Sequence, residues 1–354
     1  MLSPDPERQT VDPIVRQSRE GTGVKRFSRV TLLVAALAVA LTTVALQPAA
    51  TTGQTKLTMV FVPSRETDIV LFSGQQIGRM LGVALGVPVE AVVSTSYTAA
   101  IEAMCAGRAD IGALNPFSYV LAHEKCNVEV AAISVRFGLP YYRAQINVRA
   151  DANINKIEDL RGKRFAFVDP ASTSGYLFPA ALLKKLGYDP DRFFSQTVFA
   201  GSHPNVILAV YRGQVDGGTT FEDARSTVQA QFPDVMQKVK VIGYTNPIPN
   251  DTWSLSVRLN PALRARIKDR LLRIATTNEG KEALRNLYSI EGLTDRVVLT
   301  EEQVRSLGIR FDEETQARIT RAGGRVTIPV GDWYFQPIRD AATYLGLDLT
   351  KLAR

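Results

Sequence analysis

The chain has 354 residues, of which 45% are hydrophobic and 22% are charged, so its composition is that of a globular protein rather than a disordered or collagen-like chain. This length predicts two domains, or one domain preceded by a tail. Two cysteines and two histidines are too few for a disulfide framework, a zinc finger or a four-cysteine iron–sulfur site. The net charge of +7 fits an anionic small ligand or a membrane surface, and the scattered basic residues do not favour a nucleic-acid partner.

The N-terminal part has the layout of a secretory signal. Lys25, Arg26 and Arg29 precede an uncharged apolar run at residues 30–46, and small residues follow it. The run is at the short limit for crossing a bilayer, and no clean cleavage motif follows, so both a cleaved signal and a retained anchor stay open. We expect residues 1–55 to form this segment and a linker, with the remainder in the periplasm or another extracytoplasmic space.

In such a compartment Cys105 and Cys126 can form a disulfide, because disulfides persist there. Their spacing alone does not decide whether they do.

The first part of the body alternates short apolar runs with stretches of helical periodicity. This βαβαβ order predicts a parallel sheet with helices on both faces. The expected strands are 57–62, 89–94 and 109–114, and the expected helices are 68–85 and 98–106.

A second round of alternation follows, and then the chain becomes helical after Trp253. Two such α/β halves facing each other predict a ligand cleft at the carboxyl ends of their strands. The expected strands are 144–150, 164–169, 196–201, 215–220 and 238–245; the expected helices are 170–185, 205–213, 261–278 and 279–288.

The sharpest local motif joins a strand to a helix and reads Asp169-Pro-Ala-Ser172-Thr173-Ser174-Gly175. Backbone N–H groups at a helix N-terminus lack intrahelical partners, and together with the helix dipole they attract anions. Three hydroxyl groups add further donors for a tetrahedral oxyanion. The alternative is ordinary N-capping, for which serine and threonine are favoured in any case.

Further candidates lie at other strand ends. His203 follows a strand and precedes a helix, where its ring can donate to an anion or simply belong to a capped loop. Tyr97 and the pair Tyr141-Tyr142 can each form the wall of a pocket and donate a hydrogen bond, although a single tyrosine is often only packing.

Four carboxylates lie near these segments: Asp216, Glu222, Asp223 and Asp251. Near an anion site, a carboxylate serves a ligand that also has a cationic group, or accepts a proton from a ligand hydroxyl. The alternative for each is hinge or surface polarity, and for Asp216 a structural role is favoured.

No enzyme signature is present: the chain has no G-x-S-x-G, Walker loop, H-E-x-x-H or G-x-G-x-x-G motif. A Ser-His-Asp triad would need His203 or His123, and an arrangement of Ser174, His203 and Asp216 is one that the sequence leaves open. We therefore expect a binding protein rather than an enzyme, with no cofactor and no metal.

Taken in order, several segments resemble the substrate-binding proteins of phosphate, phosphite and phosphonate ABC transporters over about residues 56–300. They are SYTAAIEAM, GRADIGALNPFSYVLA, DPASTSGYLFPAALLKKLGYDP, FAGSHPNVILAVYRGQVDGG and NPIPNDTW. The resemblance implies a type II periplasmic-binding fold, with two α/β lobes, each a mostly parallel sheet flanked by helices. Lobe one is expected at residues 56–143 and 253–354, and lobe two at 144–252, with a hinge at the two chain crossings.

The resemblance also implies roles for individual residues. Ser172, Thr173, Ser174 and His203 would hold the oxyanion, and Tyr97 and Tyr141 would be the two cleft tyrosines, with Tyr142 as the alternative to Tyr141. In relatives that bind aminophosphonates two carboxylates hold the amine, and by position these fall on Asp251 and on Asp223 or Glu222.

The expected function is capture of a phosphonate, phosphite or related phosphorus oxyanion by hinge closure, for delivery to the permease and ATPase of an ABC importer. The alternative is a periplasmic sensor of a phosphorus or arsenic oxyanion that signals to a membrane kinase. An enzyme of the same fold is a further alternative. Residues 300–354 contain no assignable motif and can complete the first lobe.

Overall fold

The computed structural model describes residues 56–311, 313–321 and 325–352. The predicted signal or anchor at residues 30–46 lies outside these residues. None of the helices within the described ranges is long and apolar enough to cross a membrane.

The first sheet has six strands in the order β13-β4-β12-β3-β1-β2. β1 pairs in parallel with both β2 and β3, whereas β12 enters between β3 and β4 and pairs antiparallel with each. β12 and β13 therefore run opposite to the other four strands. The strands are β1 (Leu57–Phe61), β2 (Val89–Val93), β3 (Ile111–Leu114), β4 (Glu129–Val135), β12 (Thr252–Leu255) and β13 (Gly292–Thr294).

The second sheet has five strands in the order β10-β6-β9-β7-β8. Only β6 runs against its neighbours. Both sheets are therefore mixed rather than mostly parallel, because the antiparallel pairings of β12, β13 and β6 are at least as frequent as the parallel ones. The lobe boundaries at 143/144 and 252/253 stay a prediction. The strands are β6 (Ala144–Arg149), β7 (Arg164–Phe167), β8 (Gln196–Phe199), β9 (Gly217–Phe221) and β10 (Val239–Tyr244).

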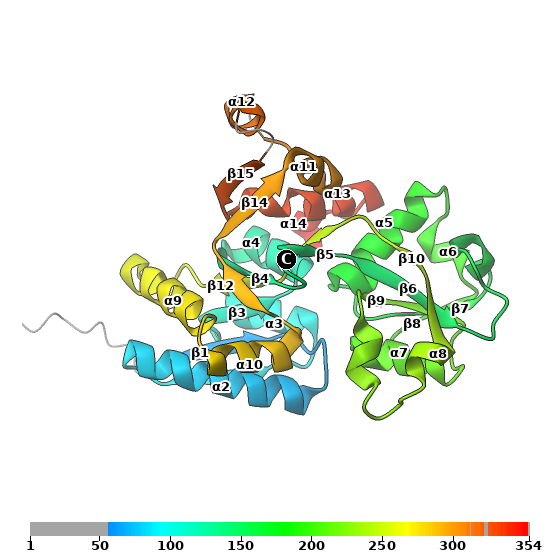
Figure 1. Ribbon diagram of the computed structural model, residues 1–354, viewed down its shortest axis with the longest axis horizontal. Helices are drawn as coiled ribbons and strands as arrows, with labels where there is room; N and C mark the ends of the chain where they lie inside the picture. Colours follow the sequence, from blue (N-terminus) through cyan, green and yellow to red (C-terminus); the bar gives the residue numbers. More distant parts are fainter. Residues whose placement is uncertain (1–55, 312, 322–324, 353–354) are drawn as a thin grey trace, which may run out of the picture. The chain divides into compact units, whose positions relative to one another are not determined.

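The helix α2 (Thr67–Leu85) packs closely against the first sheet, and α10 (Asn278–Tyr288) lies alongside α2 (Figure 1). Two glycines make this approach possible. A Cβ atom on Gly74 would lie 2.6 Å from the Phe61 ring, and one on Gly78 would lie 2.9 Å from the Val89 carbonyl oxygen.

Further helices connect the strands of each sheet. Those around the first sheet are α3 (Tyr97–Cys105), α4 (Pro116–Cys126) and α9 (Pro261–Ile274). Those around the second are η1 (Ile157–Leu160), η2 (Thr173–Leu177), α5 (Phe178–Lys185), α6 (Pro190–Phe193), α7 (His203–Tyr211), η3 (Ala224–Val228) and α8 (Val235–Lys238).

Two short strands stand where the chain passes from one sheet to the other and back. β5 (Tyr141–Tyr142) and β11 (Ile248–Pro249) pair antiparallel as a separate two-stranded sheet. The sequence predicts a hinge at these crossings, and the pairing joins the two connecting segments to each other.

The C-terminal part contacts both halves of the body. The Tyr119 hydroxyl of α4 donates to Asp332, and the Lys184 ammonium of α5 lies 5.5 Å from the centre of the Tyr344 ring. This part comprises β14 (Arg296–Thr300), α11 (Glu301–Leu307), α12 (Glu313–Arg321), β15 (Arg325–Pro329), η4 (Asp332–Phe335), α13 (Gln336–Leu345) and α14 (Leu349–Leu352).

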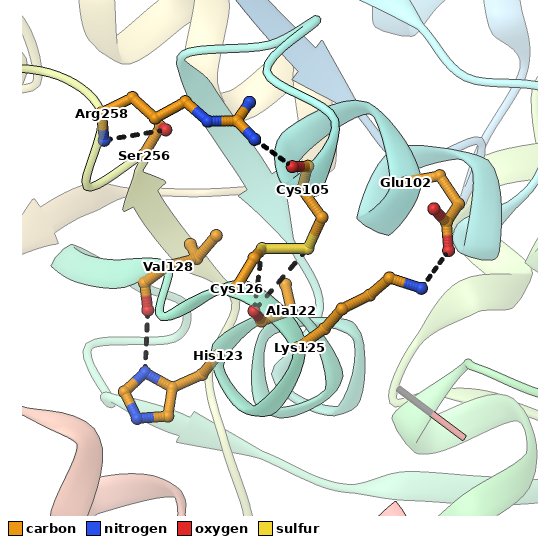
Figure 2. Close-up of a disulfide and its surroundings, with 9 residues drawn as sticks. All are labelled: Glu102, Cys105, Ala122, His123, Lys125, Cys126, Val128, Ser256 and Arg258. Carbon is orange, nitrogen blue, oxygen red and sulfur yellow. Dashed lines mark hydrogen bonds and ion pairs between the residues drawn. A yellow bond between two sulfur atoms is a disulfide. The ribbon is translucent and has the colours of Figure 1, made fainter. Parts of the chain in front are cut away.

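Cys105 and Cys126 form a disulfide that joins the end of α3 to the end of α4 (Figure 2). An Arg258 guanidinium N–H donates to the Cys105 carbonyl oxygen at 2.6 Å, which ties the same corner to the segment after β12. The structure thus resolves the pairing that the sequence leaves open.

Replacing both cysteines with serine is expected to lower the free energy of unfolding by about 3 kcal/mol, because the bridge removes loop-closure entropy from the unfolded chain. Urea denaturation of the double variant measures this loss. Reduced wild-type protein, the matched control, should unfold at the same urea concentration as the variant. An unchanged midpoint in the double variant would show that the bridge does not stabilise the fold.

Candidate anion-binding site

An enclosed cavity of about 30 Å³ lies where residues from both sheets and their loops meet. A volume of this size holds about two or three water molecules, so the cavity suits a small ligand. Its polar lining comes from Ser64, Tyr97, Asn115, Ser134, Arg136, Tyr142, Ser172, Ser174, His203, Asp251, Thr252 and Tyr288.

The serine–threonine–serine turn begins the helix formed by η2 and α5. The Ser172 hydroxyl oxygen caps this helix by accepting from the Gly175 N–H at 3.1 Å, so its own hydrogen remains available to a ligand. Capping and ligand binding are therefore compatible roles for this residue. A Cβ atom on Gly175 would lie 2.4 Å from Val168, so only glycine fits the tight turn.

Thr173 is placed differently from the two serines. Its hydroxyl donates to the Asn115 side chain at 2.6 Å and accepts from the Phe117 N–H at 2.8 Å, both at the start of α4. Thr173 does not line the cavity. It instead links the turn after β7 to a helix of the other half.

His203 lies at the first position of α7, with its side chain 3% exposed. Its Nδ1 atom accepts from the Phe221 N–H at 3.1 Å, which assigns the proton of the neutral ring to Nε2. Burial, and secondarily the charge of Arg136, lower the pKa of His203 to about 3. At neutral pH this residue is an uncharged hydrogen-bond donor to the cavity.

Of the two adjacent tyrosines, Tyr142 lines the cavity and Tyr141 does not. The Tyr141 hydroxyl accepts from the Gln303 amide at 3.1 Å instead. Tyr97 also lines the cavity, and its buried hydroxyl has no hydrogen-bond partner among the described residues.

The carboxylates separate into one inside the cavity and three elsewhere. Asp251 lines the cavity, and burial raises its pKa to about 6. Glu222 forms an ion pair with Arg143 at 2.6 Å, and the exposed Asp223 has a left-handed backbone with φ of 69°. Neither of these two lines the cavity.

The catalytic arrangement that the sequence leaves open is not assembled. Asp216 forms an ion pair with Arg164 at 2.9 Å, and the Nδ1 atom of His203 is occupied by the Phe221 N–H. Within the described ranges, no group of three or more His, Cys, Asp or Glu side chains is placed to hold a metal ion.

Sequence reasoning missed Arg136, which follows β4 and lines the cavity with 4% of its surface exposed. Its guanidinium lies 4.8 Å from the centre of the Phe221 ring and 5.7 Å from that of Tyr142. A single arginine after an apolar run carries no sequence signal for such a role. Sequence reasoning also missed Asn115 and Tyr288, which line the cavity.

This fold, with an enclosed polar cavity at a helix N-terminus, defines a solute-binding protein of the periplasmic-binding class. Residues 59–296 match the family model described as "ABC transporter, phosphonate, periplasmic substrate-binding protein". The chain belongs to this family, which confirms the resemblance that the sequence motifs indicate. Because the family is periplasmic, its members act outside the cytoplasmic membrane.

Two curated relatives and one solved structure illustrate the similarity. The chain is 30% identical over 223 residues to the phosphate-import protein PhnD of Mycolicibacterium smegmatis, over 60% of this chain and 70% of that protein. It is 31% identical over 208 residues to the phosphonates-binding periplasmic protein of Escherichia coli, over 57% of this chain and 61% of that protein. PhnD1 of Prochlorococcus marinus in complex with methylphosphonate has a TM-score of 0.66 at 17% identity, over 82% of this chain and 98% of that one. This likeness confirms the type II periplasmic-binding fold.

The depressed pKa of His203 predicts a loss of stability in acid. Below about pH 6.5 the imidazole of the unfolded chain takes up a proton, whereas the folded protein stays neutral at this residue down to about pH 3. Between pH 7 and pH 5 the wild type should therefore lose about 2 kcal/mol of unfolding free energy that His203→Gln does not lose.

Urea denaturation at pH 7, 6 and 5 measures this difference between the two proteins. The raised pKa of Asp251 has the opposite effect on the free energy of unfolding. As the pH falls from about 6, the folded state takes up a proton at Asp251 before the unfolded chain does, which favours the folded state. That contribution is common to both proteins and cancels in the comparison. Parallel pH profiles would contradict a buried neutral imidazole.

Proposed function

We propose that this protein captures a small phosphorus oxyanion, such as a phosphonate, phosphite or phosphate, and delivers it to the permease and ATPase of an ABC importer. It binds its ligand without turning it over. The observation that carries the proposal is the convergence of Ser172, Ser174 and His203 on one small enclosed cavity at a helix N-terminus.

The cavity supplies what a desolvated anion needs. Burying an anion is unfavourable unless hydrogen bonds and positive charge replace its water. The serine hydroxyls, the His203 Nε2–H group and the unpartnered Tyr97 hydroxyl are donors along one small space. First-turn N–H groups of the helix add to them, because they lack intrahelical partners.

Contacts across the cavity support capture by hinge closure. The backbone N–H of His203 donates to the Ser64 carbonyl oxygen at 3.2 Å, and the Ser118 hydroxyl donates to the Ala171 carbonyl oxygen at 3.3 Å. With the Thr173 contacts to α4, they join the two halves around the ligand space. The paired strands β5 and β11 are the proposed hinge, as in other binding proteins that close around a ligand.

The names of the relatives agree with this ligand class, since one is a phosphate-import protein and the other a phosphonates-binding protein. We further propose that residues 30–46 direct the chain across the cytoplasmic membrane and are then removed or retained as an anchor. The permease and ATPase would be its membrane partners.

A thermal-shift screen of the purified protein tests the ligand class. Phosphate, phosphite, methylphosphonate, 2-aminoethylphosphonate and arsenite are the probes. A ligand at a hundred times its Kd adds about 2.7 kcal/mol to the stability of the folded state, which should raise Tm by about 5 °C. A shift with arsenite alone would favour the sensor function, and no shift with any phosphorus oxyanion would contradict the proposal.

Single substitutions separate binding from closure. Ser172→Ala removes a donor from the cavity and should weaken binding by about 10- to 100-fold. Thr173→Ala removes the contact to Asn115 and should instead raise the dissociation rate. The double variant should bind very weakly while remaining folded.

Thr277→Ala is the matched control for these variants. Thr277 caps α10 by accepting from the Gly280 N–H at 3.0 Å, and it does not line the cavity. The control should lose a comparable amount of stability, about 1 kcal/mol, with unchanged affinity. Wild-type affinity in the Ser172→Ala, Thr173→Ala double variant would refute the proposed site.

A further inference from the structure

Arg136 is held rigidly at the wall of the cavity. It precedes a two-residue turn in which Phe137 and Gly138 both have positive φ, 51° and 69°, as a type I′ hairpin requires. The N–H and carbonyl of Arg136 pair with those of Leu139 at 3.0 and 2.9 Å. The Gly138 N–H donates to the Glu291 carboxylate at 2.8 Å, which anchors the turn.

The guanidinium of Arg136 is buried near one acidic group, Asp251, but forms no ion pair with it. Its Nε atom has no hydrogen-bond partner among the described residues, and none of the ion pairs formed by these residues includes its side chain. Its neighbours are the faces of the Phe221 and Tyr142 rings. A guanidinium remains charged in proteins, and an unpaired buried charge is strongly unfavourable.

The acidic groups near the cavity are too few to balance the charge of Arg136 and also to bind a cationic group of the ligand. Asp251 is the one carboxylate among the cavity-lining residues. Glu222 forms an ion pair with Arg143 outside the cavity, which balances its charge, and Asp223 is exposed. A ligand ammonium group would therefore meet one carboxylate and, in the same small space, the positive charge of Arg136.

We infer that Arg136 is a specificity-determining residue, which binds an anionic oxygen of the ligand and selects phosphorus oxyanions without an ammonium group. Phosphite, phosphate and unsubstituted alkylphosphonates belong to this class, whereas aminophosphonates do not. The inference rests on the proposed function, because it concerns the same cavity. It assigns to Arg136 the fixed positive charge that the hydroxyl donors do not provide.

Isothermal titration calorimetry on the full-length wild type, Arg136→Met and Arg136→Lys tests this role. Phosphite is the first probe, followed by hydroxymethylphosphonate and aminomethylphosphonate, which are matched in size and differ in charge. Arg136→Met should weaken phosphite binding about a hundredfold, and Arg136→Lys should lose less, because it keeps the charge but not the planar fork.

The matched pair reports on selectivity. The wild type should bind hydroxymethylphosphonate about tenfold or more tightly than aminomethylphosphonate, and Arg136→Met should narrow this preference. Arg143→Met is the control, since Arg143 is paired with Glu222 and does not line the cavity. It should leave both affinities unchanged.

Thermal denaturation of the ligand-free proteins separates ligand binding from a structural role. Because Arg136 forms no ion pair that the substitution would break, the apolar side chain of Arg136→Met should avoid the cost of burying the charge, and the ligand-free variant should melt at or above the wild-type Tm. A structural arginine would give the opposite result.

The outcomes distinguish this inference from the proposed function. Suppose that the wild type binds phosphite and that Arg136→Met either binds it with an affinity within about threefold of the wild type or melts well below the wild type. The role of Arg136 is then refuted, while the proposed function stands. A preference of the wild type for aminomethylphosphonate would also refute it. If the wild type binds sulfate but no phosphorus oxyanion, and Arg136→Met abolishes that binding, the proposed function fails while the charge-binding role stands.

Discussion

A buried anion is stable only where donors and positive charge replace its hydration, and the residues that line the cavity meet this constraint. The helix beginning at Thr173 brings N–H groups to one wall, while Ser172 turns its capping hydroxyl toward the cavity. Burial keeps His203 neutral, so it donates without adding charge. In the proposed site Arg136 provides the permanent charge, on a turn that its own backbone hydrogen bonds hold in place.

These groups come from both halves of the molecule, so neither half alone completes the site. Arg136 and Asp251 follow or precede strands of the first sheet, whereas Ser172, Ser174 and His203 follow strands of the second. Thr173 joins the same turn to α4 rather than facing the ligand space. In the proposed function, ligand binding and closure are coupled through neighbouring residues of this turn.

The positions of the serine–threonine–serine turn and of His203, each between a strand and a helix, could be predicted because such junctions have a strong local signal. Their role in ligand binding stays a proposal. The choice between Tyr141 and Tyr142 could not, because consecutive strand residues point to opposite sides. Residues 115–143 gave no predicted element, although α4 and β4 lie there. In α4, residues 116–122 are all buried, so its sequence lacks the polar face that marks an amphipathic helix. Arg136 was missed because its role arises only from tertiary burial.

A crystal structure of the protein grown with phosphite tests the central claim most directly. The account predicts phosphite in the enclosed cavity, with its oxygens within about 3 Å of the Ser172 and Ser174 hydroxyls and the Arg136 guanidinium. Phosphite bound elsewhere, or a cavity that holds only water in a protein saturated with phosphite, would contradict it.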